Sequence, residues 1–459
     1  MGELTCFKAY DIRGELGVDI DASIAYRIGR AVSQHFNSNN VIVGRDARET
    51  SPEFAEAASQ GIMDAGAKVL DIGLAGTEEM YWAVTEYKAD AGIIVTASHN
   101  PINYNGMKIV KKGSKPLDDV LDFKVIKKIA ENKNWTQNTQ RGTISDITEE
   151  ARAKYVSVVL KFIDISKLKP LKIVINSGNG AAGPTFDAIA NALEIEKAPI
   201  EFVRVHHKPD CTFPNGIPNP LLVENRAATA DIVVAENADL GVAFDGDFDR
   251  CFFFDEFGRF IGGEYILSLL ATIFLEKNPG SKIIHDPRVI WNVQDIVGRK
   301  GGKAIQSKTG HAFIKQAMRI SKAIYGGEMS AHHYFRDFAY CDSGMIPMLL
   351  ILELISTSGR SLGDFVHDSF VAFPSSAETN FYVEDPDTAI ERVLMAYRDD
   401  ALYLDKTDGV SLTFSDWRFN LRSSNTEPLV RLNIESRGDA SKLEARVTDI
   451  ANILCGTQV

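Results

Sequence analysis

The order of secondary structure is indicated most clearly by residues 41–72, which read VIVGRDARETSPEFAEAASQGIMDAGAKVLDI. The apolar run Val41–Val43 predicts a strand. Ser51 followed by Pro52 predicts the N-cap and first turn of a helix, where proline is well tolerated. A second strand is expected at Val69–Ile72. This order of strand, helix and strand predicts an α/β layer fold.

The same alternation starts again twice further along the chain. Apolar runs at Lys172–Asn176 and Lys282–His285 predict the first strands of a second and a third α/β unit. Further strands of these units are expected at Asp231–Ala235 and Ala323–Tyr325. From about Phe373 the strands alternate apolar with polar residues, which is typical of an antiparallel sheet with one exposed face. We therefore predict three similar α/β domains with mixed sheets between helices, and a smaller C-terminal α+β domain. The expected bounds are 1–146, 147–256, 257–370 and 371–459.

The composition is that of a globular protein, with 459 residues of which 45% are apolar and 24% charged. A net charge of −12 argues against broad binding to nucleic acid or to an anionic membrane. The apolar stretches Tyr265–Phe274 and Met345–Ile355 are too short to span a membrane and predict buried helices. The N-terminus shows no apolar signal core, and the five cysteines lie far apart without a Cys-x-x-Cys pair. We expect reduced thiols and a cytoplasmic location.

A run of three carboxylates carries the strongest chemical signal. Asp245, Asp247 and Asp249 follow the predicted strand Gly241–Phe244 at alternate positions. Like charges this close repel one another unless a cation or protons intervene, and all-oxygen ligands favour Mg²⁺ or Ca²⁺. A calcium EF-hand is rejected because Arg250 stands where that loop requires glycine. A solvated acidic turn remains possible, as does a phosphatase that uses Asp245 as its nucleophile.

Three other loops offer groups that bind or transfer phosphate and sugar. Ser98 lies in the segment Thr96–Pro101 after a buried strand, at the strand end where α/β sites usually form. Glu328 and Ser330 suit hydrogen bonding to a polyol. The segment Arg422–Pro428 offers a guanidinium, hydroxyls and backbone N–H groups, which suit a phosphate. Taken alone, the Ser98 loop is more typical of a plain turn, and each of the other two loops is as consistent with a plain turn as with a binding site.

A glycine pattern at Gly178–Gly183 has the spacing of a dinucleotide-binding loop. Such a site needs an acidic residue at the end of the next strand, whereas Glu201 stands near the start of Ile200–Val205. We therefore do not predict a dinucleotide site here.

Taken together and in this order, the four loops resemble those of the α-D-phosphohexomutase family over essentially the whole chain. The segment Ala9–Gly14 is similar to the N-terminal segment of that family. The resemblance implies four domains around a central cleft and reversible conversion of mannose 6-phosphate and mannose 1-phosphate for GDP-mannose synthesis. It also implies a hexose 1,6-bisphosphate as intermediate and activator. Glucose phosphates are the alternative substrates, and a sugar-phosphate-binding protein without turnover is the alternative that is not an enzyme.

The resemblance also implies roles for individual residues. Ser98 would carry a phosphoryl group, and Ser98, Asp245, Asp247 and Asp249 would hold one Mg²⁺ per chain. Lys108 would be the general acid and base, with a pKa lowered by the cleft. The other implied catalytic residues are Arg13, His99 and His311. The implied substrate-binding residues are Tyr10, Arg250, Arg288, Glu328, Ser330, His332, Arg422, Ser423, Ser424, Asn425, Thr426 and Arg431. The expected partners are sugar phosphates, with no nucleic acid and no membrane.

Overall fold

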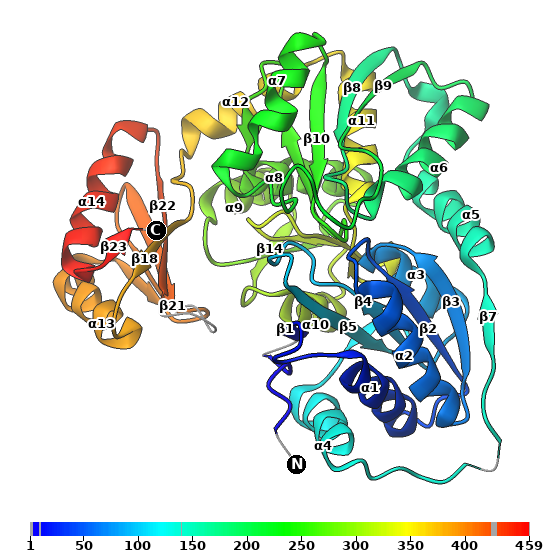
Figure 1. The fold of residues 1–459 in the computed structure, drawn as a ribbon. Coiled ribbons are helices and arrows are strands. Elements are labelled where there is room, and N and C mark those ends of the chain that lie inside the picture. Colours follow the sequence, from blue (N-terminus) through cyan, green and yellow to red (C-terminus); the bar gives the residue numbers. More distant parts are fainter. Residues whose placement is uncertain (1–2, 9–10, 139, 424–428, 459) are drawn as a thin grey trace. The chain divides into compact units, whose positions relative to one another are not determined.

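The computed structural model describes residues 3–8, 11–138, 140–423 and 429–458. The chain forms two compact units, the first made of residues 1–260 and 337–361 and the second of residues 261–336 and 362–459. Figure 1 shows the ribbon, in which three α/β layers are followed along the chain by a β-rich C-terminal domain. This four-domain α/β architecture confirms the predicted fold class. The central cleft implied by the family resemblance would be formed by domains of both units, and it stays a prediction.

The first sheet has mixed strand directions. Its strands lie in the order β1 (Ile12–Glu15), β5 (Tyr104–Lys111), β4 (Ala91–Val95), β2 (Asn40–Arg45), β3 (Lys68–Leu74) and β7 (Ile144–Asp146), and β6 (Lys115–Pro116) pairs with β5. Strands β4, β2, β3 and β7 are parallel, whereas β5 runs antiparallel to both β1 and β4. The helices of this domain are α1 (Ala22–His35), α2 (Ser51–Asp64), α3 (Thr77–Glu86) and α4 (Lys124–Asn132). Helix α5 (Thr148–Val159) follows β7 and packs against α3 and β3 of this domain and against α6 (Ala182–Ile195) of the next.

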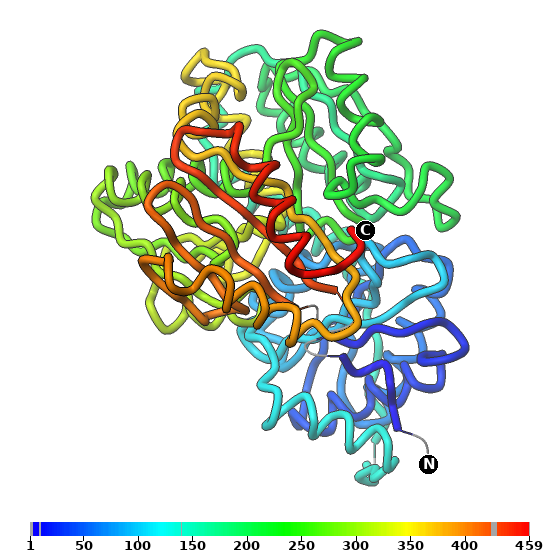
Figure 2. Tube along the Cα trace, turned by 90° about the vertical axis from the view of Figure 1, so that its left-hand side faces the viewer, coloured from blue at the N-terminus to red at the C-terminus, as the bar shows by residue number. Residues whose placement is uncertain are grey.

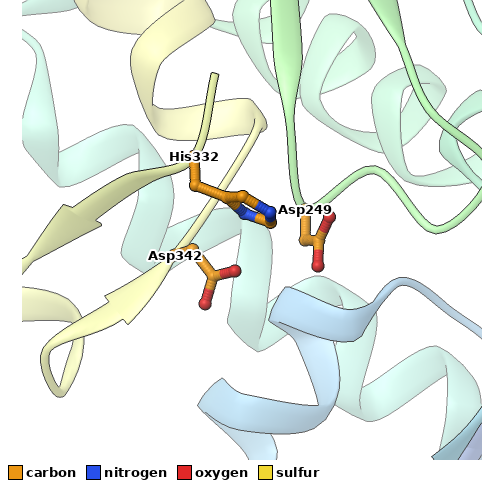
Figure 3. Close-up of side chains that lie close together, drawn as sticks. All are labelled: Asp249, His332 and Asp342. Carbon is orange, nitrogen blue, oxygen red and sulfur yellow. The ribbon is translucent and has the colours of Figure 1, made fainter. Parts of the chain in front are cut away.

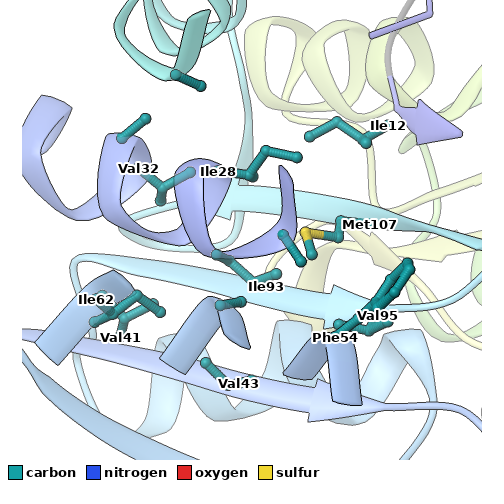
Figure 4. Packing of buried hydrophobic residues seen from close by; sticks show 14 of the residues in the cluster. Ile12, Ile28, Val32, Val41, Val43, Phe54, Ile62, Ile93, Val95 and Met107 are labelled. Atoms are coloured by element: carbon teal, nitrogen blue, oxygen red, sulfur yellow. The ribbon is translucent and has the colours of Figure 1, made fainter. Parts of the chain in front are cut away.

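A hydrophobic core holds α1 and α2 against this sheet (Figure 4). Val41 and Val43 of β2 belong to this core and Ile42 does not, because successive side chains of a strand point to opposite faces. Ile28 and Val32, one turn apart on α1, supply the facing surface. The predicted N-cap of α2 was one residue too late, since the cap is Thr50 and the Ser51 hydroxyl donates to Asp46 instead.

The second sheet has the order β12 (Phe260–Ile261), β11 (Cys251–Phe254), β10 (Leu240–Phe244), β8 (Leu171–Asn176) and β9 (Ile200–Val205). Its helices are α6 (Ala182–Ile195) and α7 (Ala227–Ala235), and the first unit also contains β17 (Cys341–Asp342) and α11 (Met345–Ser358). The predicted strand Asp231–Ala235 was wrong, because these residues end α7. Thr229 and Val233, four positions apart, are the buried residues of that helix, and a short apolar run does not show this period.

In the second unit, strands β14 (Lys303–Gln306), β13 (Lys282–His285), β15 (Tyr325–Gly327) and β16 (His333–Phe335) lie in this order. The helices are α8 (Gly263–Lys277), α9 (Trp291–Arg299), α10 (His311–Ser321) and α12 (Leu362–Ala372). The strand predicted at Ala323–Tyr325 begins two residues later than expected. The predicted helices Tyr265–Phe274 and Met345–Ile355 are confirmed within α8 and α11. Among the described residues, no single helix is long and apolar enough to cross a membrane.

The C-terminal domain is an antiparallel sheet with helices on one face. Its strands lie in the order β19 (Tyr403–Asp405), β20 (Val410–Thr413), β21 (Trp417–Ser423), β22 (Leu429–Ser436), β18 (Thr379–Tyr382) and β23 (Thr457–Gln458). Helices α13 (Pro386–Tyr397) and α14 (Leu443–Leu454) contribute to the same core as Phe419 and Leu421 of β21. Figure 2 shows α14, in red, running past the strands of this sheet. The predicted α+β domain is therefore confirmed.

Candidate active site

Ser98 stands just beyond the end of β4 in a sharp turn. Its backbone has a φ of +47°, a left-handed conformation that non-glycine residues adopt at some cost. The Ser98 N–H donates to the Thr96 hydroxyl at 2.8 Å, and the Ser98 hydroxyl donates to Asp245 Oδ2 at 2.8 Å. The strained turn thus presents the serine hydroxyl directly to the carboxylate loop that follows β10.

The carboxylate loop places three aspartates around one point. Asp245, Asp247 and Asp249 are buried, and one carboxylate oxygen of each lies within 4.8 Å of the others. Within the described part of the chain, Oδ1 of Asp245 and Oδ1 of Asp247 have no hydrogen-bond partner. Buried charges without partners are costly, so this oxygen set fits a hard divalent cation. A Cβ on Gly246 would lie 2.4 Å from the Ser98 carbonyl oxygen, which explains why glycine stands between the first two aspartates.

Lys108 lies on β5, the strand that pairs with β4, and its side chain reaches the carboxylate loop. Its Nζ lies 2.7 Å from Asp247 Oδ2 and 2.5 Å from Asp249 Oδ2. Burial opposes the charge on this ammonium group, but Asp247 and Asp249 outweigh burial and raise the pKa of Lys108. The expectation of a lowered pKa is therefore wrong for this arrangement. The cause is the ion pair with the two aspartates, which are 139 and 141 residues away in the sequence.

Arg48 holds the serine turn in place, although no sequence motif marks it. Its guanidinium donates to the backbone carbonyls of Ser98 at 3.0 Å and Asn100 at 2.5 Å. It also donates to the carbonyls of Pro101 and Tyr104, at 2.9 and 3.1 Å. Asp46 lies beside Arg48 and accepts from the N–H of Arg48 at 3.0 Å. One buried cation therefore binds four carbonyls of a single loop.

The other predicted residues of the first unit surround the serine and the carboxylates. Arg13 donates to the Thr96 carbonyl at 3.1 Å. His99 Nδ1 lies 3.0 Å from the Ser98 hydroxyl. Arg250 binds Asp245 Oδ2 through two donors, at 2.9 and 2.7 Å, and also contacts His99. The first unit thus brings together every described residue predicted to act on the transferred phosphoryl group, except His311.

Three further residues of the first unit lie in or near the carboxylate site, and no sequence motif predicts them. Thr77, at the start of α3, donates from its hydroxyl to Asp247 Oδ2 at 2.5 Å. Asp342 of β17 lies within 4.8 Å of Asp249, carboxylate to carboxylate (Figure 3). Glu78 accepts from the Gly344 and Met345 N–H groups at the start of α11, and burial raises the pKa of Glu78 to about 8. None of these residues belongs to a local motif.

In the second unit, the predicted sugar-binding residues form a hydrogen-bonded group. Arg288 donates to Asp286 and, at 3.1 Å, to the Ser330 hydroxyl. Glu328 accepts from the Gly310 N–H at 2.7 Å and from the Tyr334 hydroxyl at 2.5 Å. Gly310 immediately precedes His311, the first residue of α10.

The two adjacent histidines of the sugar loop differ in environment. His333 is fully buried in β16, where its Nδ1 lies 2.7 Å from the Tyr325 hydroxyl. Burial and the neighbouring His332 lower the pKa of His333 to about 3. His332 is only half-buried and stacks on Tyr334 at a centroid distance of 6.0 Å. Because His333 is held in the core, this difference favours His332 as the histidine able to meet a ligand.

The predicted phosphate loop begins at the end of β21. Arg422 Nη2 donates to Glu378 Oε2 at 3.0 Å, and Arg431 of β22 lies 3.5 Å from Glu378 Oε1. Ser423 is the last residue of β21. The predicted residues Tyr10, Ser424, Asn425 and Thr426 lie outside the described residues.

The glycine pattern at Gly178–Gly183 lies against the carboxylate loop. The Ala181 N–H donates to the Gly246 carbonyl at 3.0 Å, and a Cβ on Gly180 would meet that carbonyl oxygen at 2.8 Å. These glycines allow one backbone to approach another, which gives the pattern a structural explanation.

Four family models match consecutive parts of the chain. They describe the α/β/α domains I, II and III of phosphoglucomutase/phosphomannomutase, at residues 5–136, 153–258 and 262–373, and the C-terminal domain of the same family at residues 378–453. The chain belongs to the phosphoglucomutase/phosphomannomutase family. Our own domain bounds, which differ from these by two to ten residues, stay a prediction.

Individual members of this family are similar to the chain over nearly its full length. A phosphomannomutase of Escherichia coli K12 is 53% identical over 456 residues, which are 99% of this chain and 100% of the relative. The crystal structure of a phosphoglucomutase/phosphomannomutase family protein from Burkholderia thailandensis is 30% identical with a TM-score of 0.86, covering 99% of this chain and 97% of its own. The fold also matches N-acetylphosphoglucosamine mutase of Aspergillus fumigatus, solved with GlcNAc-6P and magnesium, at 13% identity and a TM-score of 0.65 over 98% of this chain and 96% of its own.

Proposed function

We propose that this chain is a phosphomannomutase, which interconverts mannose 6-phosphate and mannose 1-phosphate through a phosphoserine at Ser98 and a hexose 1,6-bisphosphate. The observation that carries the proposal is the 2.8 Å hydrogen bond from the Ser98 hydroxyl to Asp245, the first of three buried aspartates. The family relationship and the name of the Escherichia coli relative support the mannose substrate.

The charges around Ser98 favour a divalent cation in the working protein. A phosphoserine carries up to two negative charges. It would replace a hydroxyl that now donates a hydrogen bond to Asp245. Ser98, Asp245, Asp247 and Asp249 would hold Mg²⁺, in agreement with the magnesium in the Aspergillus fumigatus structure. When bound, the ion would offset negative charge on the phosphoryl group that is transferred.

The transfer needs little covalent activation, because phosphoryl transfer depends mainly on positioning and charge. The P–O bond to Ser98 Oγ breaks, a new P–O bond forms to the sugar hydroxyl, and that hydroxyl gives up its proton. Lys108 contacts Asp247 of the carboxylate loop, and Arg13 contacts the Thr96 carbonyl at the base of the serine turn. We assign Lys108 to accept and return the proton, and Arg13 to orient the reacting hydroxyl. Lys108 can accept the proton only in a state in which Asp247 and Asp249 bind the cation instead of its ammonium group, because these two carboxylates raise its pKa. His99 would hold Ser98 Oγ, to which its Nδ1 lies at 3.0 Å.

The second unit would bind the part of the substrate that does not react. Glu328 and Ser330 carry oxygens suited to two sugar hydroxyls, and Arg422 and Arg431 carry charges suited to the second phosphate. The bisphosphate would turn over between the two transfers, so these groups must accept both orientations. Sugar-phosphate binding by relatives such as the Aspergillus fumigatus enzyme supports this assignment.

Mannose and glucose differ only at C2, whereas the family resemblance assigns Glu328 and Ser330 to the sugar O3 and O4. A contact that does not touch the differing carbon cannot discriminate strongly. We therefore propose measurable activity on glucose phosphates as well.

Incubation with mannose 1-phosphate, Mg²⁺ and a trace of glucose 1,6-bisphosphate tests the assignment. Mannose 6-phosphate should form, and Ser98→Ala should form none. An inactive wild-type protein that is folded and metal-loaded would refute the proposal. A preference for mannose above roughly 10⁴-fold in kcat/KM would reveal a contact at C2.

A further inference from the structure

Three guanidinium groups of the second unit converge on one carboxylate. Glu378 Oε2 lies 3.0 Å from Arg422 and 3.6 Å from Arg288, and Glu378 Oε1 lies 3.5 Å from Arg431. Arg422 and Arg431 are direct partners on the antiparallel strands β21 and β22. Like charges placed opposite each other on a sheet repel, so an anion between them removes a cost that the sheet would otherwise carry.

The carboxylate of Glu378 is held mainly by charge. Among the described residues, only Arg422 contacts Glu378 at the length of a normal hydrogen bond, and the side chain of Glu378 is still 24% exposed. Burial opposes its ionisation, but Arg288, Arg422 and Arg431 outweigh burial and lower the pKa of Glu378, so it is an anion at neutral pH. A loosely held anion with a path to solvent can be exchanged for another.

A phosphate matches these arginines better than a carboxylate does. It carries up to two charges and more acceptor oxygens, and arginine forks bind it through paired hydrogen bonds. Phosphate and carboxylate cannot share the position, because two anions within a few ångströms repel strongly in a partly buried site. Asp286 also accepts two hydrogen bonds from Arg288, so Arg288 already has a carboxylate partner besides Glu378.

We propose that Glu378 is an internal anion of the phosphate-binding site and that a phosphate binds to Arg422 and Arg431 by displacing it. The inference rests on the proposed function only for the identity of the ligand. Glu378 would keep the two arginines oriented before the substrate binds. It would also compete with the phosphate group of the bound product for these arginines, which favours product release. The apparent affinity for phosphate is then reduced by the fraction of molecules in which the carboxylate occupies the site.

Calorimetric titration with inorganic phosphate, at matched ionic strength, tests the proposal without turnover. Glu378→Gln keeps the shape of the side chain and removes the competing charge, so it should bind phosphate at least about fivefold more tightly than wild type. Glu384→Gln changes an exposed glutamate of the same domain and should bind as wild type does. Adding Arg422→Ala to Glu378→Gln should abolish the gain, which locates it at this site.

The opposite results would overturn the proposal. Equal or weaker phosphate binding by Glu378→Gln, in a variant with a native circular dichroism spectrum, means that Glu378 only positions the arginines. If Glu378→Gln does not fold, Glu378→Asp retains the charge but withdraws it from the arginines and should bind phosphate more tightly than wild type; unchanged binding would also refute competition. Since inorganic phosphate is the probe, these outcomes do not depend on which sugar, if any, the protein isomerises.

Discussion

Arg48→Met removes the guanidinium that holds the serine turn while keeping most of the side-chain volume. The wild-type side chain is buried and donates to four carbonyls of residues 98–104, at 2.5 to 3.1 Å. Hydrogen bonds to charged groups contribute about 1.5–3 kcal/mol each, so even two of them match or exceed the strain of one left-handed residue, about 1–3 kcal/mol, and hold it in place. The turn should therefore relax and displace the Ser98 hydroxyl from Asp245.

A displacement of the order of 1 Å costs roughly 10²-fold in rate. We therefore expect kcat to fall by about 10²- to 10³-fold, with little change in KM, because the described hydrogen bonds of the Arg48 side chain all go to the serine turn. A coupled assay of mannose 6-phosphate formation measures both constants. Arg48→Lys keeps a charge beside Asp46 but cannot bind four carbonyls, so it should recover only part of kcat.

Arg27→Met is the matched control, since Arg27 also donates to backbone carbonyls of the same domain, those of Ala130 and Glu131, far from Ser98 in the sequence. It should lower the thermal stability and leave kcat unchanged. If folded Arg48→Met kept kcat within about threefold of wild type, or lost activity only through KM, the positioning role would be refuted.

Three further predictions concern the metal loop, the phosphate site and a buried acid. Asp247→Asn should weaken Mg²⁺ binding and activity, and activity within about twofold of wild type at saturating Mg²⁺ would contradict the metal assignment. Arg422→Ala should lower kcat/KM by roughly 10²- to 10³-fold and Arg422→Lys by less, measured in the same assay. Burial raises the pKa of Glu78 from 4.5 to about 8. The protonated carboxyl therefore adds up to about 5 kcal/mol to the free energy of unfolding below pH 4.5, and this contribution is lost as the pH rises towards 8. Glu78→Gln should therefore flatten the fall in thermal stability between pH 5 and 8, and parallel curves for the two proteins would show that Glu78 does not titrate there.

The α/β order could be predicted because buried strands are continuous apolar runs and the helices between them begin at recognisable residues. Short runs remain ambiguous, which is why residues 231–235 were taken for a strand although they end α7. The change to an antiparallel C-terminal sheet was visible because alternation shows directly which face is exposed.

Ser98 and the three aspartates could be identified because each lies in a local motif at the end of a strand. Arg48, Thr77 and Glu378 could not, because their roles arise from contacts across 44 to 170 residues of sequence. The raised pKa of Lys108 was missed for the same reason, since its two carboxylate partners come from another domain. Local chemistry is therefore readable from sequence, whereas the charges that surround it depend on the tertiary fold.

The central claim is that Ser98 carries the phosphoryl group. Intact mass and peptide mapping after incubation with glucose 1,6-bisphosphate and Mg²⁺ test this directly. We expect one phosphoryl group per chain, on Ser98, stable in acid and removed when mannose 6-phosphate is added. A label on Asp245 that hydroxylamine cleaves, or an active protein that never carries a label, would contradict the account.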